Sequence, residues 1–331
     1  MSGVSRRRLL IGGGAALFVL AGCGGDGGGE APGSAASGGG LWEFTDDRGK
    51  KATRDSRPTK IVAQLSAAAT LWDFGIRPVG VFGEAKGNDV LKGNVEVNAV
   101  QWVGQTWGEF NIEKLASLAP DLLVAPMQSK DQLWYVPEDA VGKIEPLCPS
   151  VGINQFEVPV DQVIGRFAAL AGSLGADLNA SAVTSAKADF DAAGKALAEA
   201  VTAKPGLRVA FVSGTKENLY LGNAKIFSDL AFLQNLGVNF VQPAAPADEP
   251  HWEVLSWEQA GKYPADVLLY DSRNASYFTT DLARYPTVAN LPAVKANQAV
   301  AWNPETPSTW AAFSAALRDL TGKLSAFKTV A

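Results

Sequence analysis

Residues 107–124 read WGEFNIEKLASLAPDLLV, and residues 256–270, SWEQAGKYPADVLLY, repeat the same arrangement in the second half of the chain. In each stretch a glutamate, Glu113 or Glu258, lies eight residues before the aspartate that opens an apolar run. In each, an asparagine or serine suited to cap a helix stands two places before the glutamate. A carboxylate in the first helical turn favours the helix dipole, which explains either glutamate alone. It does not explain the same unit in both halves, so the repeat indicates a shared functional role.

Short runs rich in Val, Ile and Leu surround this repeat and predict buried strands. These runs are residues 60–65, 78–82, 121–125, 208–212, 267–270 and 299–302. Helical patterns lie between them, for example in residues 67–74 and 227–236. Buried strands that alternate with helices predict α/β layers, with one group of strands in each half.

A long helical stretch, residues 161–203, separates the two groups of strands. Apolar residues recur in it at helical spacing from Val183 to Val201, with Asn179 or Ser181 as the expected cap and Lys204-Pro205-Gly206 as the expected end. The expected divisions of the chain are residues 1–22 (export signal), 23–40 (lipidated cysteine and tether), 41–160 (first lobe), 161–203 (connecting helical segment) and 204–331 (second lobe).

The N-terminal residues predict export and a lipid anchor. The pair Arg6-Arg7 precedes an apolar stretch, residues 11–20, which is too short to span a bilayer and is typical of a twin-arginine signal peptide. Leu20-Ala21-Gly22-Cys23 resembles a bacterial lipobox, so Cys23 is expected to carry lipid; a chance cysteine after a signal peptide is the alternative. The Gly-, Ala- and Ser-rich residues 24–40 then predict a flexible tether. We expect the protein on the extracytoplasmic face of the cell membrane.

Composition narrows the chemistry. The formal net charge of −5 argues against nucleic acid as a partner. The single histidine, His251, excludes a His-rich metal cluster by counting. With Cys23 lipidated, Cys148 has no disulfide partner and is expected to be a buried, inert thiol.

From Leu41 onward the chain resembles the periplasmic binding proteins for ferric siderophores and vitamin B12, chiefly through the segment from Trp107 to Leu122. The resemblance implies a hairpin and two α/β lobes joined by a single long helix, with the ligand in the cleft between the lobes. It also implies a monomer that delivers its ligand to an ABC permease. Glu113 and Glu258 match the family's two lobe-tip glutamates, which dock onto arginines of the permease dimer.

Loops at strand ends supply the expected ligand-binding residues, because open α/β sheets bind ligands there. The candidates are Ser66, Trp102, Trp107, Trp134, Tyr135, Tyr220, Trp252, Arg273, Tyr277, Trp302 and Trp310. We expect Trp107 and Trp302 to face each other across the cleft, and Trp72 and Trp257 to fill the core.

Charge favours a ferric hydroxamate siderophore as the ligand. Three hydroxamates cancel the charge of ferric iron, whereas a tris-catecholate stays a trianion and calls for several cations. Arg273 is the one arginine expected in a cleft loop, and the lysines that could approach are Lys86, Lys130, Lys216 and Lys225. The iron enters only inside its chelate, and we expect no cofactor and no direct metal ligand.

A corrinoid or haem is the alternative ligand. In other functional classes, the alternatives are a secreted lipoprotein hydrolase and a structural or adhesion lipoprotein. The chain lacks a Gly-x-Ser-x-Gly motif and offers only His251 as an imidazole base, so we expect no enzyme activity.

Overall fold

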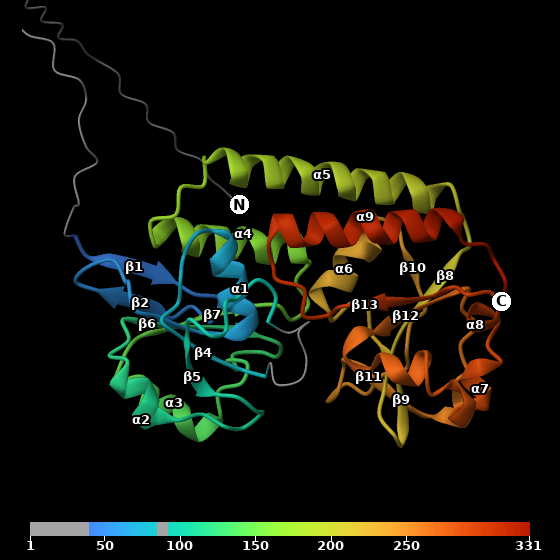
Figure 1. The fold of residues 1–331 in the computed structure, drawn as a ribbon, viewed down its shortest axis with the longest axis horizontal. Helices are drawn as coiled ribbons and strands as arrows, with labels where there is room; N and C mark the ends of the chain where they lie inside the picture. Colours follow the sequence, from blue (N-terminus) through green and yellow to red (C-terminus); the bar gives the residue numbers. More distant parts are fainter. Residues whose placement is uncertain (1–39, 85–91) are drawn as a thin grey trace, which may run out of the picture. The chain divides into compact units, whose positions relative to one another are not determined.

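The computed structural model describes residues 40–84 and 92–331. Arg6, Arg7, Cys23 and Lys86 therefore lie outside the described residues. Residues 39–331 form one structural unit, which contains both lobes (Figure 1). Within the described residues, every helix is too short or too polar to span a bilayer.

The first lobe is built on a parallel sheet with the strand order β5-β4-β3-β6-β7. Its strands are β3 (Ile61–Gln64), β4 (Gly80–Phe82), β5 (Gln101–Gly104), β6 (Leu122–Met127) and β7 (Ser150–Asn154). Its helices are α1 (Leu65–Asp73), α2 (Ile112–Ser117) and α3 (Glu138–Ile144). A separate antiparallel hairpin, β1 (Trp42–Thr45) with β2 (Lys51–Arg54), precedes the lobe.

The second lobe has a mixed six-stranded sheet in the order β11-β9-β8-β12-β13, with β10 paired to β8. Its strands are β8 (Arg208–Gly214), β9 (Asn218–Gly222), β10 (Asn239–Phe240), β11 (Trp252–Ser256), β12 (Val267–Asp271) and β13 (Ala299–Trp302). Its α-helices are α6 (Ser228–Asn235), α7 (Pro286–Ala289) and α8 (Pro292–Lys295). Its 3-10 turns are η1 (Trp257–Gln259), η2 (Ser272–Phe278) and η3 (Leu282–Arg284). All six strands predicted from the sequence are present, as are both predicted helices.

The central strands are apolar at most positions because both faces of each sheet are buried. In β3, Ile61 and Ala63 join the core shared by the two lobes, whereas Val62 packs into a second core on the opposite face. In β8, Phe211 joins the same shared core and Val212 joins a third core that belongs to the second lobe. The shared core thus runs continuously from one lobe into the other.

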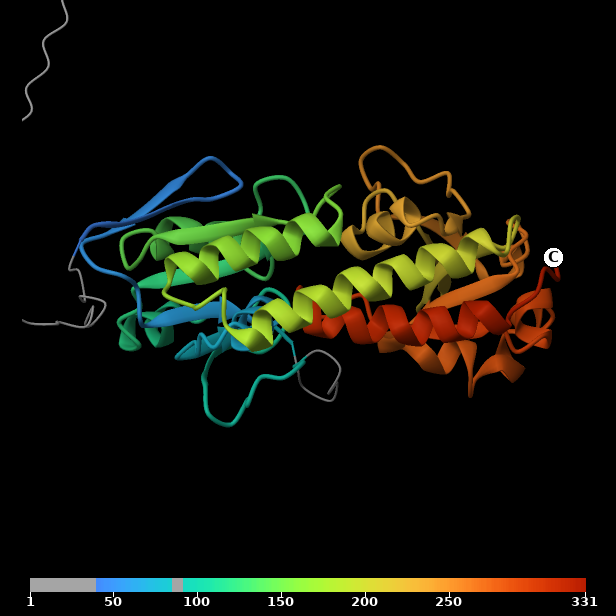
Figure 2. The same cartoon turned by 90° about the horizontal axis from the view of Figure 1, so that it is seen from above.

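Long helices link the lobes. The stretch 161–203 divides into α4 (Val160–Ser173) and α5 (Ser181–Thr202), and α5 lies beside the C-terminal helix α9 (Trp310–Ala326) in both views (Figures 1 and 2). Near its start α5 lines one pocket together with the end of α1, and further along Phe190 stacks on Phe232 of α6, so residues of α5 border both lobes. The expected cap is wrong, because α5 begins after Ala180, which makes no side-chain capping bond.

Cys148 is buried and free, and burial raises the pKa of its thiol to about 12. This agrees with an inert thiol.

Candidate ligand-binding cleft

Two cavities lie between the lobes, and both are bordered by Arg273 and Glu305. The smaller, of about 310 Å³, is lined by Gln64, Leu65, Ser66, Glu84, Tyr135, Arg273, Asn274 and Glu305. The larger, of about 540 Å³, is lined by Gln128, Ser129, Lys130, Trp134, Phe156, Phe227, Ala247, Asp248, Glu249, Pro250, His251, Trp252, Arg273, Pro304 and Glu305. We call the two together the interlobe cleft.

The topology of the sheets explains the polar lining of the smaller cavity. Gln64 ends β3, and Glu84 follows β4 by two residues. Arg273 follows β12 by two residues, and Glu305 follows β13 by three. Carboxyl ends of parallel strands meet at one edge of a sheet, where open α/β folds place their ligands.

Arg273 is held by two carboxylates. Its Nη2 lies 2.7 Å from Oδ2 of the fully buried Asp271, and its Nη1 lies 3.0 Å from Oε1 of Glu305. Burial by itself would lower the pKa of Arg273. The hydrogen bonds and charge of Asp271, together with the charge of Glu305, outweigh this effect and raise the pKa. Burial also raises the pKa of the Glu305 carboxyl, against the opposing charge of Arg273. The positive charge of Arg273 is therefore already balanced by these two carboxylates before any ligand binds.

Among the described residues that line the interlobe cleft, carboxylates outnumber cations. The lining carboxylates are Glu84, Glu305, Asp248 and Glu249, and the lining cations are Lys130 and Arg273. Among the described residues, no cation lies within ion-pair distance of Glu84; its carboxylate is 3.5 Å from the hydroxyl of Tyr135. The described lining therefore carries more negatively than positively charged side chains.

Aromatic rings form one wall of the interlobe cleft. Trp134 and Tyr135 pack against Trp107, whose ring centroid is 4.8 Å from that of Trp134 and 5.0 Å from that of Tyr135. Trp107 is 58% exposed. Tyr135 has φ +64°, a strained conformation for a bulky residue, and burial raises its pKa to about 12, helped by the charges of Glu305 and Glu84.

Of the residues proposed from the sequence, five line the interlobe cleft and two more touch its aromatic walls. Those that line it are Ser66, Trp134, Tyr135, Trp252 and Arg273. Trp107 contacts the cleft residues Trp134 and Tyr135, and the ring of Tyr220 lies 6.1 Å from that of Trp252.

The structure places four candidates elsewhere. Trp102 packs against the shared core, and Trp310, the first residue of α9, meets Phe74 edge-on at 5.8 Å. Tyr277 packs on Trp257 in the core of the second lobe. Trp302 is buried, and its indole N–H donates to Asp229 at 2.5 Å. Trp107 and Trp302 therefore do not face each other, because the ring of Trp302 points into the core from β13.

Sequence reasoning missed the polar residues Glu84, Asn274 and Glu305 and the aromatic residues Phe156 and Phe227. Glu84 and Glu305 directly follow predicted strands, so their position at strand ends was a usable signal. His251 also lines the interlobe cleft, and its Nε2 lies 3.0 Å from the carbonyl oxygen of Gln128 in the other lobe. Burial lowers the pKa of His251.

The two repeated glutamates, Glu113 and Glu258, are not among the residues that line the interlobe cleft, and both are exposed. Glu113 is in the first turn of α2, which Asn111 caps by accepting from the backbone N–H of Lys114. Glu258 is in η1, where Ser256 and Gln259 form a capping box, so the expected second helix is a single 3-10 turn. The backbone N–H of Glu258 and the hydroxyl of Ser256 lower the pKa of Glu258.

Within residues 40–84 and 92–331, no group of His, Cys, Asp and Glu side chains is arranged to hold a metal ion.

The fold and the interlobe cleft are those of a known family. Residues 62–306 match the family model described as periplasmic binding protein. The chain belongs to the periplasmic binding protein family. Periplasmic binding proteins of this kind are the extracytoplasmic solute-binding partners of ABC importers.

The chain is also similar to individual proteins. DesE, a ferric-siderophore receptor protein from Streptomyces coelicolor, is 38% identical with a TM-score of 0.82, covering 88% of this chain and 100% of that chain. The Fe(3+)-citrate-binding protein YfmC of Bacillus subtilis is 24% identical over 262 residues, which are 76% of this chain and 75% of YfmC. FhuD2 from Staphylococcus aureus, solved with bound ferrioxamine B, has a TM-score of 0.54 at 18% identity, covering 80% of this chain and 98% of that chain.

Proposed function

We propose that this periplasmic binding protein captures a ferric hydroxamate siderophore in the interlobe cleft and delivers it to an ABC permease. DesE, to which the chain is 38% identical, is described as a ferric-siderophore receptor, which supports a ferric chelate as the cargo. The choice among chelates rests on the charge of the cleft.

The observation that carries this choice is the neutralised state of Arg273. An arginine that already pairs with Asp271 and Glu305 has little capacity left for an anionic chelate. Glu84 and the rim carboxylates Asp248 and Glu249 add further negative charge. A ferric tris-catecholate, with three negative charges, would meet repulsion there, whereas a neutral or cationic trihydroxamate would not.

The aromatic walls fit the same ligand. Phe156, Phe227, Trp134 and Trp252 line the larger cavity and offer apolar surface to the linkers of a hydroxamate chelate. The volume of about 540 Å³ is within the usual range for small-molecule sites. A corrinoid or haem is the alternative ligand; the propionates of haem would find Arg273 already paired, with Lys130 as the other described cation of the lining.

We propose a binding role without catalysis. His251, the one histidine, has its Nε2 directed at the carbonyl oxygen of Gln128, which supports a structural contact between the lobes. A secreted hydrolase would need this imidazole as its base.

We further propose that Glu113 and Glu258 dock onto arginines of the permease, one from each lobe, and that a monomer carries out delivery. Both carboxylates are exposed at the start of a helix or turn, and among the described residues neither has an ion-pair partner. Charge pairs of this kind orient two surfaces and speed their encounter. Lipid on Cys23 and the tether after it would hold the protein at the extracytoplasmic face of the membrane.

Intrinsic tryptophan fluorescence tests the ligand. The purified protein is titrated with ferrioxamine B, its iron-free form, a ferric tris-catecholate and haem, and quenching is measured. We expect saturable binding of ferrioxamine B and much weaker binding of the other three. Tight binding of the tris-catecholate or of haem would overturn the proposed ligand class.

A further inference from the structure

The two repeated segments, residues 111–121 and 256–266, correspond residue by residue. Asp121 accepts from the backbone N–H of Lys60 at 2.9 Å, and its own N–H donates to the carbonyl of Lys60 at 2.8 Å. Asp266 makes the same two bonds with Arg208, both at 2.8 Å. The aspartates thus anchor each segment at the same place in its sheet, and the glutamates before them occupy equivalent positions.

Within this shared frame the apolar positions of the two segments carry different side chains. Leu115 of α2 is completely buried and packs in a core of the first lobe. Its counterpart in the second lobe is the small Ala260, followed by Gly261, in a segment that begins with the single turn η1 where the first lobe has a helix. Ala260 and Gly261, two and three residues beyond Glu258, line an open space in the second lobe.

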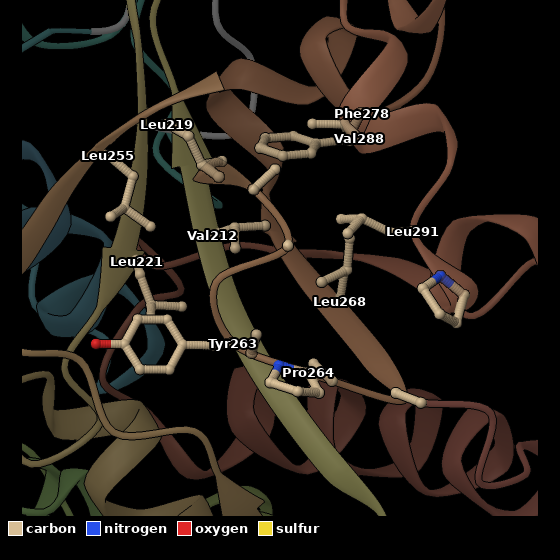
Figure 3. A pocket seen from close by; sticks show the side chains of 16 residues that line it. Val212, Leu219, Leu221, Leu255, Tyr263, Pro264, Leu268, Phe278, Val288 and Leu291 are labelled. Carbon is tan, nitrogen blue, oxygen red and sulfur yellow. The ribbon is translucent and has the colours of Figure 1, made fainter. Parts of the chain in front are cut away.

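That space is an apolar cavity of about 230 Å³ (Figure 3). Side chains from the strands and from the segment carrying η2, α7 and α8 converge on it, among them Val212, Leu219, Leu268, Phe278 and Val288.

The one lining hydroxyl, that of Tyr263, bonds Glu253 at 2.8 Å. The other side chains that line the cavity are apolar. Gly261 and Pro264, three and six residues beyond Glu258, are exposed and line the cavity, and so is the exposed Pro292.

We propose that this cavity receives an apolar side chain of the permease subunit whose cation pairs with Glu258. The proposal rests on the proposed docking role of the glutamates. The carboxylate and the exposed lining residues Gly261 and Pro264 belong to one short segment, so a partner loop that carries a cation beside an apolar residue fits both. A surface ion pair alone contributes little affinity, whereas an apolar anchor buried in a pocket is the usual source of it. The second lobe therefore holds the permease by an anchor that the first lobe lacks.

Ala260→Leu tests this by placing the side chain that the first lobe has at Leu115 at the equivalent position, which lines the cavity. Uptake of radiolabelled ferrioxamine B is measured in cells that express each variant as their only copy. We expect uptake at limiting protein to fall by roughly tenfold or more, with ferrioxamine B affinity unchanged and thermal stability equal or higher. Ala188→Leu, an exposed position on α5, is the matched control and should take up ligand as the wild type does.

Gly261→Trp adds a large side chain at an exposed lining position and supplies the same readout if Ala260→Leu does not fold. Gly261 tolerates a side chain, because the nearest atom to a Cβ built there is 4.0 Å away. Wild-type uptake in a folded Ala260→Leu variant would overturn the proposal and leave the cavity as unfilled space. The affinity of the wild-type protein for ferrioxamine B and the uptake that it supports are measured first. These two measurements test the proposed function independently of the Ala260→Leu result.

Discussion

Two buried carboxylates of the second lobe, Asp271 and Asp229, are each satisfied by specific hydrogen-bond partners. Asp271 has no exposed surface, and it is satisfied by Arg273 and by the hydroxyl of Ser213 at 3.1 Å. Asp229 is held in the core by the indole of Trp302. Asp271 takes up part of the hydrogen-bonding capacity of Arg273, and Asp229 holds the indole of Trp302 in the core. Arg273 is therefore only partly available to a ligand, and Trp302 is not available at all.

Arg273→Ala should destabilise the protein whether or not ligand is present. The substitution leaves the buried carboxylate of Asp271 without its cation, and breaking a buried pair costs about 3–5 kcal/mol. Because the side chain of Arg273 is 30% exposed, we expect about 3 kcal/mol from urea unfolding. Arg284→Ala, an exposed arginine of the same lobe, should change the unfolding free energy little. An unchanged unfolding free energy with lost chelate affinity would assign Arg273 to the ligand instead.

Asp229 should make stability fall as pH rises. Burial raises its pKa from 3.8 to about 6, against the hydrogen bond from Trp302. A carboxyl with a raised folded-state pKa binds its proton more tightly in the folded protein, so its contribution is full below pH 4 and is lost as pH rises through 6.

The measurement is the unfolding free energy of the wild type and of Asp229→Asn at pH 4 and pH 7. The wild type should lose on the order of 3 kcal/mol more than the variant between these values, at about 1.4 kcal/mol per pKa unit. Asp248→Asn, at an exposed position, should follow the wild type. Parallel pH profiles for the wild type and Asp229→Asn would show that the carboxyl is ionised in the core.

At the scale of elements, the repeated segment combines an aspartate that anchors the sheet with an exposed glutamate for which we propose a docking role. The aspartates Asp121 and Asp266 bond the backbone of the neighbouring strand, which explains their repetition by the sheet alone. Within the part of the chain that the structure describes, Glu113 and Glu258 make no bond to the backbone of a neighbouring strand, so the sheet does not explain why the glutamate is repeated.

Glu113→Ala and Glu258→Ala should each lower the uptake of ferrioxamine B in cells, and the double variant should nearly abolish it. Both side chains are exposed, so affinity for the chelate and the melting temperature should stay at their wild-type values. Glu138→Ala is the matched control, since Glu138 is also an exposed first-turn carboxylate but outside the repeat. Reduced chelate affinity in either single variant would place that glutamate in ligand binding.

At the scale of the whole molecule, two lobes with a shared core and a shared helix α5 enclose a cleft of negative charge. Opposed lobes of this kind bring side chains from distant parts of the sequence, such as Glu84 and Arg273, into one cavity. The charge of the cleft belongs to the assembled pair of lobes.

This charge predicts the response of binding to salt. Ferrioxamine B carries a protonated amine, so its affinity should fall when the salt concentration rises from 0.01 M to 1 M, because the Debye length shrinks from about 30 to about 3 Å. Its N-acetyl derivative is neutral and should respond little. Equal salt responses of the two chelates in fluorescence titrations would refute a negatively charged cleft.

Anchoring should depend on one residue outside the described structure. Cys23→Ser should release the protein from membranes or leave it unprocessed, because the lipid would have no attachment site. Fractionation followed by immunoblotting measures this, with Cys148→Ser as the control for loss of a thiol. Unchanged membrane fractionation of Cys23→Ser would contradict the lipobox.

The fold followed from local signals in the sequence. A strand that is buried on both faces is an apolar run, as in residues 122–125, and the apolar stripe on residues 183–201 indicates a helix packed on one side, so hydrophobic patterning alone predicted these elements. Patterning did not predict strands β5, β7, β9, β10 and β11, which carry polar residues.

The interlobe cleft was only partly predictable, because a ligand site depends on which way side chains point. Nothing local distinguishes Trp134, which lines the cleft, from Trp302, which bonds Asp229 in the core. The sequence by itself determined the α/β lobes, the linking helix and the repeated glutamates, since patterning, caps and spacing are local. Only the tertiary structure decided the charge of the cleft and the apolar cavity of the second lobe, because both arise from residues that meet across sheets and lobes.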